Sequence, residues 1–313
     1  MSGFPPQTSQ TESEDRKLVI FDFDGTLTDA EIEGRPFKTG YLQDLSVLTG
    51  WNYERVQTAA TEFEAEVASH PERFGWMFKG QIVAPATVDP YLRMMPVARH
   101  LLDQAEALMM TQDRERVLDG LLYKYNYQKT ITAFRDQACE TLSSLIGAGY
   151  LGGKGGEVFV VTNSHTEAVR GKVEQLEEQR IDQQITSTSL APLVDRVFGR
   201  AQKYIVDPSF DLVAESLSLP NLNRPVLLRR KHYFEVLDDL RKKANVSWSQ
   251  VWVFGDIFEL DLSLPIALGA TVGVMANQFT PQWELDYLAT HPRGHILNHL
   301  SDALKLLKIS RHT

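Results

Sequence analysis

The sequence is short of cysteine, of long apolar runs and of basic residues, and each shortage excludes a class of protein. Cys139 is the only cysteine, so no disulfide can form within the chain, and we expect a reducing, cytoplasmic location. No run approaches the roughly 18 apolar residues of a membrane span, which argues against a membrane protein. With 32 Lys and Arg against 41 Asp and Glu, the net charge of -9 argues against a nucleic-acid partner.

What remains is an ordinary globular composition. The 313 residues are 43% hydrophobic and 23% charged, which fits a protein of about two domains. Residues 1–16 are polar and lack the apolar segment of a signal peptide, so we expect a disordered tail there. Small molecules or other proteins are therefore the expected partners.

Short apolar runs predict the strands of a parallel sheet. The runs at residues 18–21, 157–161, 251–254 and 271–275 suit strands that are buried on both faces. Residues 197–198 and 204–206 are candidate short strands, and helices are expected at residues 232–243 and 302–307. Strands that alternate with helices predict an α/β fold, with a Rossmann-like, three-layer core around the sheet.

A long segment with helical spacing separates the first two predicted strands. Apolar residues recur there at intervals of three or four, without a convincing pair of strands. We therefore predict an all-helical domain of residues 30–146, inserted into a core of residues 17–29 and 147–313. In this insert, packing or surface roles are the simplest explanation of the residues that could otherwise reach a substrate: Arg35, Lys38, Trp76, Lys79 and Arg93.

Polar residues directly follow three of the predicted strands. In open parallel sheets, ligands bind at the carboxyl ends of the strands. Three carboxylates that converge there repel one another at low dielectric and require a cation, and oxygen ligands suit Mg²⁺. The candidate residues are Asp22, Asp24 and Gly25 after the first strand, Thr162 and Asn163 after the second, and Gly255, Asp256 and Asp261 after the third.

Such a site also suits a phosphate group. Thr162 can donate a hydrogen bond to a phosphoryl oxygen, and a lysine can supply a positive charge. If the chain leaves the strand at Asp24, as Gly25 would permit, Asp22 and Asp24 can address one reacting atom. One carboxylate can then attack while the other transfers a proton.

Three segments in this order resemble the haloacid dehalogenase-like superfamily, in its DxDGT phosphatase branch. Residues 22–29 (DFDGTLTD) are similar to the first motif, residues 160–164 (VVTNS) to the second and residues 255–261 (GDIFELD) to the acidic fourth motif. The helical insert after the first motif resembles the cap domain of the subgroup that carries its cap there. The resemblance covers the core and the position of the cap, essentially residues 17–307.

The resemblance implies a role for each acidic residue. Asp22 would be the nucleophile that forms an aspartyl-phosphate, and Asp24 would act as general acid and then as general base. Mg²⁺ would be bound by the Asp22 carboxylate, the backbone carbonyl of Asp24 and the Asp256 carboxylate. Asp261 would contact a metal-bound water or orient the lysine, although Glu259 could serve in its place.

The resemblance also implies a set of phosphate-binding groups. Thr162, a lysine and backbone amides near Gly25 would stabilise the charge on the phosphoryl oxygens, and Asn163 would contact the phosphate or the substrate. Lys231 is the preferred lysine because it opens a predicted helix ahead of the acidic motif, whereas Lys203 is the alternative.

The predicted function is therefore a Mg²⁺-dependent phosphatase that acts on a small phosphorylated metabolite. Two alternatives stay open. A phosphomutase would use the same two aspartates but return the phosphoryl group to a sugar, and a binding or regulatory member would have lost catalysis.

Overall fold

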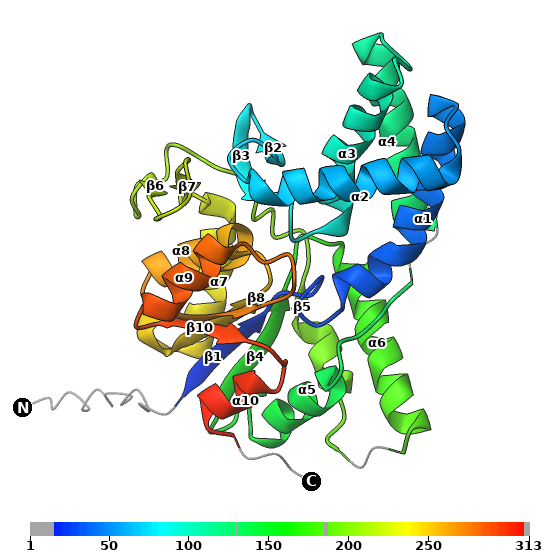
Figure 1. The fold of residues 1–313 in the computed structure, drawn as a ribbon. Coiled ribbons are helices and arrows are strands. Elements are labelled where there is room, and N and C mark those ends of the chain that lie inside the picture. The colour runs from blue at the N-terminus through cyan, green and yellow to red at the C-terminus, as the bar shows by residue number, and fades with distance from the viewer. Residues whose placement is uncertain (1–15, 129–130, 185–186, 310–313) are drawn as a thin grey trace, which may run out of the picture.

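The structure of the protein is a computed structural model that describes residues 16–128, 131–184 and 187–309. Its centre is a six-stranded parallel sheet in the order β10-β9-β8-β1-β4-β5 (Figure 1). The predicted tail, residues 1–16, lies outside the described residues apart from Arg16. The strands are β1 (Lys17–Phe21), β4 (Gly156–Val161), β5 (Val197–Phe198), β8 (Val251–Gly255), β9 (Thr271–Met275) and β10 (Gly294–Leu297).

Five of these strands lie where the apolar runs predict them. Residues 204–206, a candidate strand, instead form part of an irregular segment. No apolar run predicts β10, whose four residues GHIL contain a glycine and a histidine and lie at the edge of the sheet. Three of its four residues are exposed or half-buried, so the strand lacks the continuous apolar run of the central strands, which are buried on both faces.

Each face of the sheet carries its own apolar core. Leu18 and Ile20 of β1 pack with α7 (Lys231–Ala244), α8 (Ser263–Ala267) and α9 (Gln282–Thr290). Val19 and Phe21 point to the opposite face and pack with α5 (Ala138–Gly147), α6 (Thr166–Asp182) and α10 (Asp302–Leu307). Helices on both faces of a parallel sheet confirm the predicted three-layer α/β core.

The insert between β1 and β4 has a third apolar core of its own. Its helices are α1 (Ala30–Thr49), α2 (Tyr53–Ser69), α3 (Pro90–Gln104) and α4 (Thr111–Gln128). Asp29, Asn52 and Asp89 cap the first three by accepting backbone N–H groups of the first turn. Figure 1 shows the four helices standing clear of the sheet, above the end that carries the site.

The insert is not all helical, which corrects the prediction. β2 (Gly75–Phe78) and β3 (Gln81–Pro85) form an antiparallel hairpin between α2 and α3. The two-residue turn at Lys79 and Gly80 has positive φ at both positions, 49° and 80°, as tight hairpins require. The strands have only four and five residues, so helical spacing on either side dominates the sequence pattern.

The second boundary of the insert also differs from the prediction. Helix α5 falls within the predicted insert, residues 30–146, yet Ala138, Leu142 and Leu145 pack in the same apolar core as Val19 of β1. Because helical spacing looks the same in an insert and in a core helix, only this packing separates the two.

Shorter elements complete the chain. A second antiparallel hairpin pairs β6 (Ser216–Leu217) with β7 (Val226–Leu227). Three short helical turns are η1 (Ala191–Arg196), η2 (Trp248–Gln250) and the π-helical η3 (Phe258–Leu262). Among the helices in the described ranges, none has the length and apolar character needed to cross a membrane.

Candidate active site

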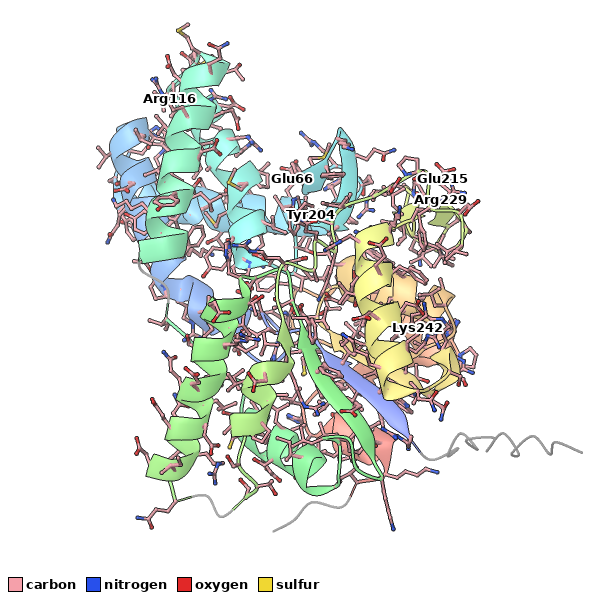
Figure 2. All side chains as sticks on the ribbon, turned by 180° about the vertical axis from the view of Figure 1, so that it is seen from behind. Glu66, Arg116, Tyr204, Glu215, Arg229 and Lys242 are labelled. Atoms are coloured by element: carbon pink, nitrogen blue, oxygen red, sulfur yellow. The ribbon has the colours of Figure 1, made fainter. Side chains whose placement is uncertain are left out.

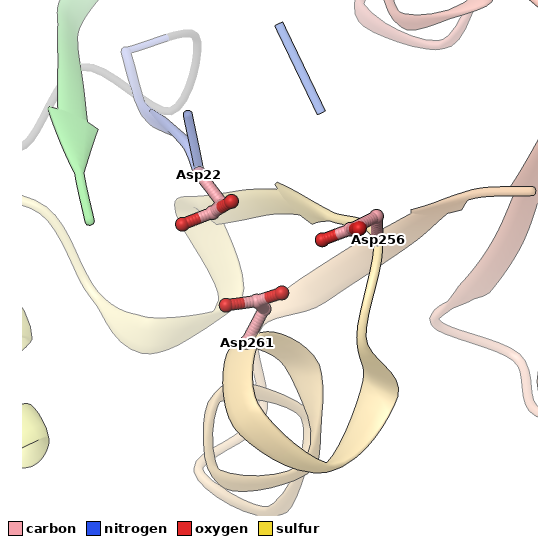
Figure 3. Close-up of side chains that lie close together, drawn as sticks. All are labelled: Asp22, Asp256 and Asp261. Atoms are coloured by element: carbon pink, nitrogen blue, oxygen red, sulfur yellow. The ribbon is translucent and has the colours of Figure 1, made fainter. Parts of the chain in front are cut away.

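Three buried carboxylates meet at the carboxyl end of the sheet (Figure 3). Asp22 follows β1, Asp256 follows β8 and Asp261 lies in η3. One oxygen of each lies within 4.8 Å of the others, and the three residues are at most 8% exposed. The structure therefore brings together three of the four aspartates that follow the predicted strands, and Asp24 is the one outside the cluster.

The chain reaches this arrangement because Gly255 leaves room for Asp261. A Cβ atom on Gly255 would lie 2.4 Å from the Asp261 Cβ atom. The π-helical turn carries Asp261 back over the strand end, where the Ile257 amide donates a hydrogen bond to its Oδ2 at 3.1 Å. The Tyr233 hydroxyl donates to the Asp261 backbone carbonyl at 2.9 Å. These contacts fix the direction of the carboxylate.

Glu259, the alternative to Asp261, points elsewhere. It is fully buried, and its two carboxylate oxygens accept hydrogen bonds from the guanidinium group of Arg224, one of them from Nη1 at 2.7 Å. Asp261, and not Glu259, is therefore the acidic residue of this turn that joins the cluster.

Lys203, rather than Lys231, reaches the cluster. The Lys203 Nζ atom lies 2.6 Å from Asp22 Oδ1 and 2.8 Å from Asp261 Oδ1, and the residue is 1% exposed. The structure contradicts the choice of Lys231, which is exposed at the first residue of α7. The loop before Lys203 turns it inward through Arg200 and Gln202, which have positive φ angles of 56° and 47°.

Asn163 holds the backbone of this lysine instead of facing the acidic cluster. Its Oδ1 accepts a hydrogen bond from the Lys203 amide at 2.8 Å. On the other side of the residue, the buried Arg230 donates from Nη1 to the Lys203 carbonyl oxygen. The backbone of Lys203 is thus fixed on both sides of the residue. Asn163 stabilises the lysine loop, residues 199–203, in this structure.

Asp24 lies outside the buried cluster, with 42% of its side chain exposed. Its Oδ2 accepts hydrogen bonds from the hydroxyl groups of Ser164 at 2.6 Å and Thr162 at 3.3 Å. Lys172 of α6 places its Nζ 3.6 Å from Oδ1. Two of these groups, Ser164 and Lys172, were not predicted as site residues. Ser164 lies within the second motif and could have been noticed, whereas no pattern in the sequence points to Lys172.

Gly25 makes the turn that separates Asp24 from the other carboxylates. Its φ of 80° is left-handed, and a Cβ atom there would lie 2.0 Å from Asp256 Oδ2. Only glycine fits this position, because any side chain would collide with the cluster. The Gly25 amide donates to the Thr28 hydroxyl at 3.2 Å, so in this structure it faces Thr28 and not the acidic cluster.

Burial dominates the electrostatics of the cluster. It raises the pKa of Asp22 to about 8; repulsion by Asp261 and Asp24 adds to the rise, and attraction to Lys203 opposes it. Burial also raises the pKa of Asp256 well above its usual value. For Lys203, burial would lower the pKa of the ammonium group, but Asp22 and Asp261 outweigh it and the pKa is raised.

The cluster fits a hard divalent cation. One ammonium group faces three carboxyl groups, so the carboxylates are not fully neutralised by the protein. All three offer oxygen donors, which Mg²⁺ prefers. Asp22 and Asp256 could hold such an ion, while Asp261 already shares the lysine with Asp22.

The hairpin of the insert packs on the loops that carry the site. Trp76 stacks on Tyr204, the residue after Lys203, with ring centroids 4.5 Å apart. Figure 2 shows Tyr204 beneath this part of the insert. Ala84 and Val88 join Ile257 and Leu260 in one small apolar cluster. Ile257 precedes η3 and Leu260 lies within it, so this cluster packs on the acidic turn, residues 257–262. Of the candidate residues in the insert, Trp76 thus packs against the site, and Arg93 is buried at 1% exposure.

Comparisons with known proteins place this geometry in a family. The chain matches the family model described as "Hydrolase: haloacid dehalogenase-like hydrolase" over residues 16–269. A search of curated proteins finds no match.

Solved structures from several bacteria are similar over most of the chain. One is a predicted phosphoglycolate phosphatase from Haemophilus somnus 129PT, with 18% identity and a TM-score of 0.47, covering 94% of this chain and 99% of that one. Another is a HAD-hydrolase from Bacillus subtilis bound to magnesium, with 13% identity, a TM-score of 0.44 and coverage of 95% and 100%. A third is a 2-haloacid dehalogenase from Pseudomonas syringae pv. Tomato DC3000, with 14% identity, a TM-score of 0.41 and coverage of 94% and 98%.

At such low identities, these structures do not distinguish one hydrolase reaction from another. The family model is more informative, because it spans all three motif segments and most of the chain. The chain belongs to the haloacid dehalogenase-like hydrolase family.

Proposed function

We propose that the protein is a Mg²⁺-dependent phosphatase that hydrolyses a small phosphomonoester through an aspartyl-phosphate intermediate. The observation that carries the proposal is the second carboxyl group, Asp24, held beside the buried cluster by the Ser164 and Thr162 hydroxyl groups. A dehalogenase needs neither a proton donor at that position nor a metal. A phosphatase uses both, because its leaving group is an alkoxide and its substrate is an anion.

Asp22 and Asp24 divide the chemistry between them. An Asp22 oxygen attacks the phosphorus atom, the bond from phosphorus to the ester oxygen breaks, and the Asp24 carboxylic acid gives its proton to the leaving alkoxide. Asp24 then takes a proton from a water molecule that attacks the same phosphorus atom. The acyl-phosphate bond breaks, which releases inorganic phosphate and restores the Asp22 carboxylate.

Lys203 and Thr162 are the proposed phosphate-binding side chains. The Lys203 ammonium group lies 2.6 Å from the Asp22 oxygen, so it is close to any phosphoryl group bonded there. Thr162 is buried at 1% exposure at the end of β4 and offers its hydroxyl toward Asp24. Fixed positive charge and a fixed hydrogen-bond donor stabilise the charge that develops on the phosphoryl oxygens.

The proposed metal ligands are the Asp22 and Asp256 carboxylates and the backbone carbonyl of Asp24. When bound, Mg²⁺ supplies positive charge that offsets the repulsion between the nucleophile and the anionic substrate. Asp261 is better suited to orienting the lysine, because its Oδ1 lies 2.8 Å from the Lys203 Nζ atom.

The insert is proposed to move during turnover. Asp22, Lys203 and Asp256 are nearly inaccessible, and the hairpin packs on the loops around them, so a substrate enters only if the insert shifts. Closure would then exclude water while the aspartyl-phosphate forms. We also propose a cytoplasmic location, in keeping with the single cysteine.

An assay with an aryl phosphate and Mg²⁺ tests the proposal. We expect wild-type protein to release inorganic phosphate and Asp22→Asn to lose at least about 10³-fold in kcat, because an amide cannot attack phosphorus. Asp211→Asn, at an exposed position, is the control and should keep full activity. Wild-type activity in Asp22→Asn would overturn the mechanism. Formation of a sugar-phosphate isomer without free phosphate would indicate a phosphomutase instead.

A further inference from the structure

The two peptide groups on either side of Gly25 are each held by a side chain. Its amide donates to the Thr28 hydroxyl, which in turn donates to Glu33 Oε2 at 3.0 Å. Its carbonyl oxygen accepts two hydrogen bonds from the guanidinium group of Arg135, from Nε at 3.1 Å and from Nη2 at 2.7 Å. Gly25 packs directly against the Asp256 carboxylate, without room for a side chain, so any displacement of this turn would shift Asp256.

Arg135 comes from the linker that returns from the insert to the core. The return linker, residues 133–135, pairs with the outgoing linker, residues 27–29. The Asp29 amide donates to the Ala133 carbonyl at 2.7 Å, and the Arg135 amide donates to the Leu27 carbonyl at 2.9 Å. Thr28 and Phe134 form an antiparallel bridge between them. The backbone of Arg135 is therefore fixed by the paired linkers, and its side chain reaches from them to the turn at Gly25.

The chemistry of arginine suits this position. A guanidinium group presents parallel N–H donors in a rigid plane, so two of them reach one carbonyl oxygen. Its positive charge also acts on Asp256, where it opposes the rise in the pKa that burial causes. A lysine would keep the charge but could not form the pair of hydrogen bonds in the same geometry.

We propose that Arg135 is a positioning residue for the metal site, which it serves by fixing the Gly25 carbonyl and with it the turn that leads from Asp24 past Asp256. The inference rests on the proposed function for the identity of the metal and of the reaction. Because Arg135 belongs to the return linker, a movement of the insert would reach the metal ligands through this side chain.

Mg²⁺ binding to the full chain tests this role without turnover. We expect isothermal titration calorimetry of Arg135→Ala to show a dissociation constant for Mg²⁺ about tenfold to a hundredfold above that of wild type, since two hydrogen bonds from a charged group to the Gly25 carbonyl are lost. At saturating Mg²⁺, kcat for an aryl phosphate should fall more than KM rises. Arg135 is only partly buried, so about 20 mM guanidinium, far below denaturing concentrations, should partly restore binding and turnover.

The controls separate positioning from folding. Arg170→Ala removes a half-buried arginine that pairs with Glu167 on α6, and should bind Mg²⁺ within about twofold of wild type. A folded Arg135→Ala that binds Mg²⁺ like wild type, or one that loses stability in proportion to binding and is not rescued by guanidinium, overturns the proposal. If Arg135→Ala does not fold, Arg135→Lys carries the same test with the same criteria. A wild-type protein that binds Mg²⁺ but hydrolyses no phosphate ester would refute the proposed function and leave the binding comparison intact.

Discussion

At the scale of single residues, Lys203 decides the charge balance of the site. It is an ammonium group with 1% exposure, paired with Asp22 and Asp261 and held through its backbone by Asn163 and Arg230. Breaking a buried ion pair by removing one partner leaves uncompensated charge, which is costly. A lysine in this setting offsets the repulsion between the carboxylates and, under the proposed function, would also offset the charge of a phosphoryl group.

The two lysines therefore predict opposite outcomes. Lys203→Met should lower kcat at least about 10²-fold, because the charge beside the nucleophile is lost, and should reduce the free energy of unfolding by about 3 kcal/mol without Mg²⁺. Lys231→Met should change kcat less than about twofold, since Lys231 is exposed on α7. Steady-state kinetics and urea unfolding of both variants check this. Equal losses in the two variants would show that Lys203 has no special role.

At the scale of secondary-structure elements, η3 packs against α9, where Phe258 of η3 contacts the rings of Trp283 and Tyr287. Glu284 of α9 is fully buried, close enough to Glu259 of η3 for their charges to repel. In the described part of the chain its two oxygens have no hydrogen-bond partner; only the Phe258 amide faces it, outside ordinary hydrogen-bond geometry. Burial raises the pKa of the Glu284 carboxyl well above its usual value, and repulsion by Glu259 raises it further. The turn that carries Asp261 thus packs against a buried carboxyl group whose ionisation is disfavoured in the folded protein.

Glu284 should make stability fall as pH rises. Its pKa is higher in the folded than in the unfolded chain, so the unfolded chain binds fewer protons between these values and the free energy of unfolding decreases with pH. Glu284→Gln cannot ionise, so we expect it to be more stable than wild type by about 1–3 kcal/mol near pH 8, with little difference near pH 4.5. Urea unfolding at both pH values checks this, with exposed Glu174→Gln as the control. A variant less stable than wild type near pH 8 would contradict it.

At the scale of the whole molecule, the insert splits the core and the acidic site lies where the two meet. The hairpin β2–β3, the lysine loop and the acidic turn share one small apolar cluster, so the insert and the catalytic loops are not independent. The net charge of -9 disfavours the binding of polyanions. A bound Mg²⁺ would supply local positive charge, which would allow a phosphorylated substrate to bind at the site.

The metal and pH should therefore be linked in the stability of the protein. The pKa of Asp22 is raised to about 8 and that of Asp256 is raised well above its usual value, so without metal the free energy of unfolding falls as pH rises from about 4 to 8. Mg²⁺ binds the ionised carboxylates and competes with protons. We expect about 5 mM Mg²⁺ to raise Tm by several degrees near pH 8 and by less near pH 5.5, measured by calorimetry.

Asp256→Asn is the control for this linkage, because it removes one proposed ligand and one raised pKa together. In this variant the increase in Tm caused by Mg²⁺ should largely disappear. An equal increase at both pH values, or one that survives in Asp256→Asn, would show that the ion binds elsewhere.

Local sequence determined much of this protein. Apolar runs define β1, β4, β8 and β9, and the polar residues that follow them mark Asp22, Asp24, Thr162 and Asp256, because a buried strand and the residue at its end are neighbours in the chain. The family resemblance rests on the same short segments, and so does the α/β class. These features depend on contacts between residues close in sequence or on the general geometry of parallel sheets.

Only the tertiary structure decided which lysine and which acid complete the site. Lys203 and Lys231 both lie in sequence contexts that could place a lysine at the site. Only the way the loop of residues 199–203 folds back buries the Lys203 ammonium group beside the Asp22 carboxylate. Asn163 turns to the lysine backbone, Glu259 turns to Arg224, α5 joins the core, and Arg135 reaches Gly25 across 110 residues. Such long-range contacts leave no periodic signal in the chain, because side-chain direction and burial are set by packing after the elements have formed.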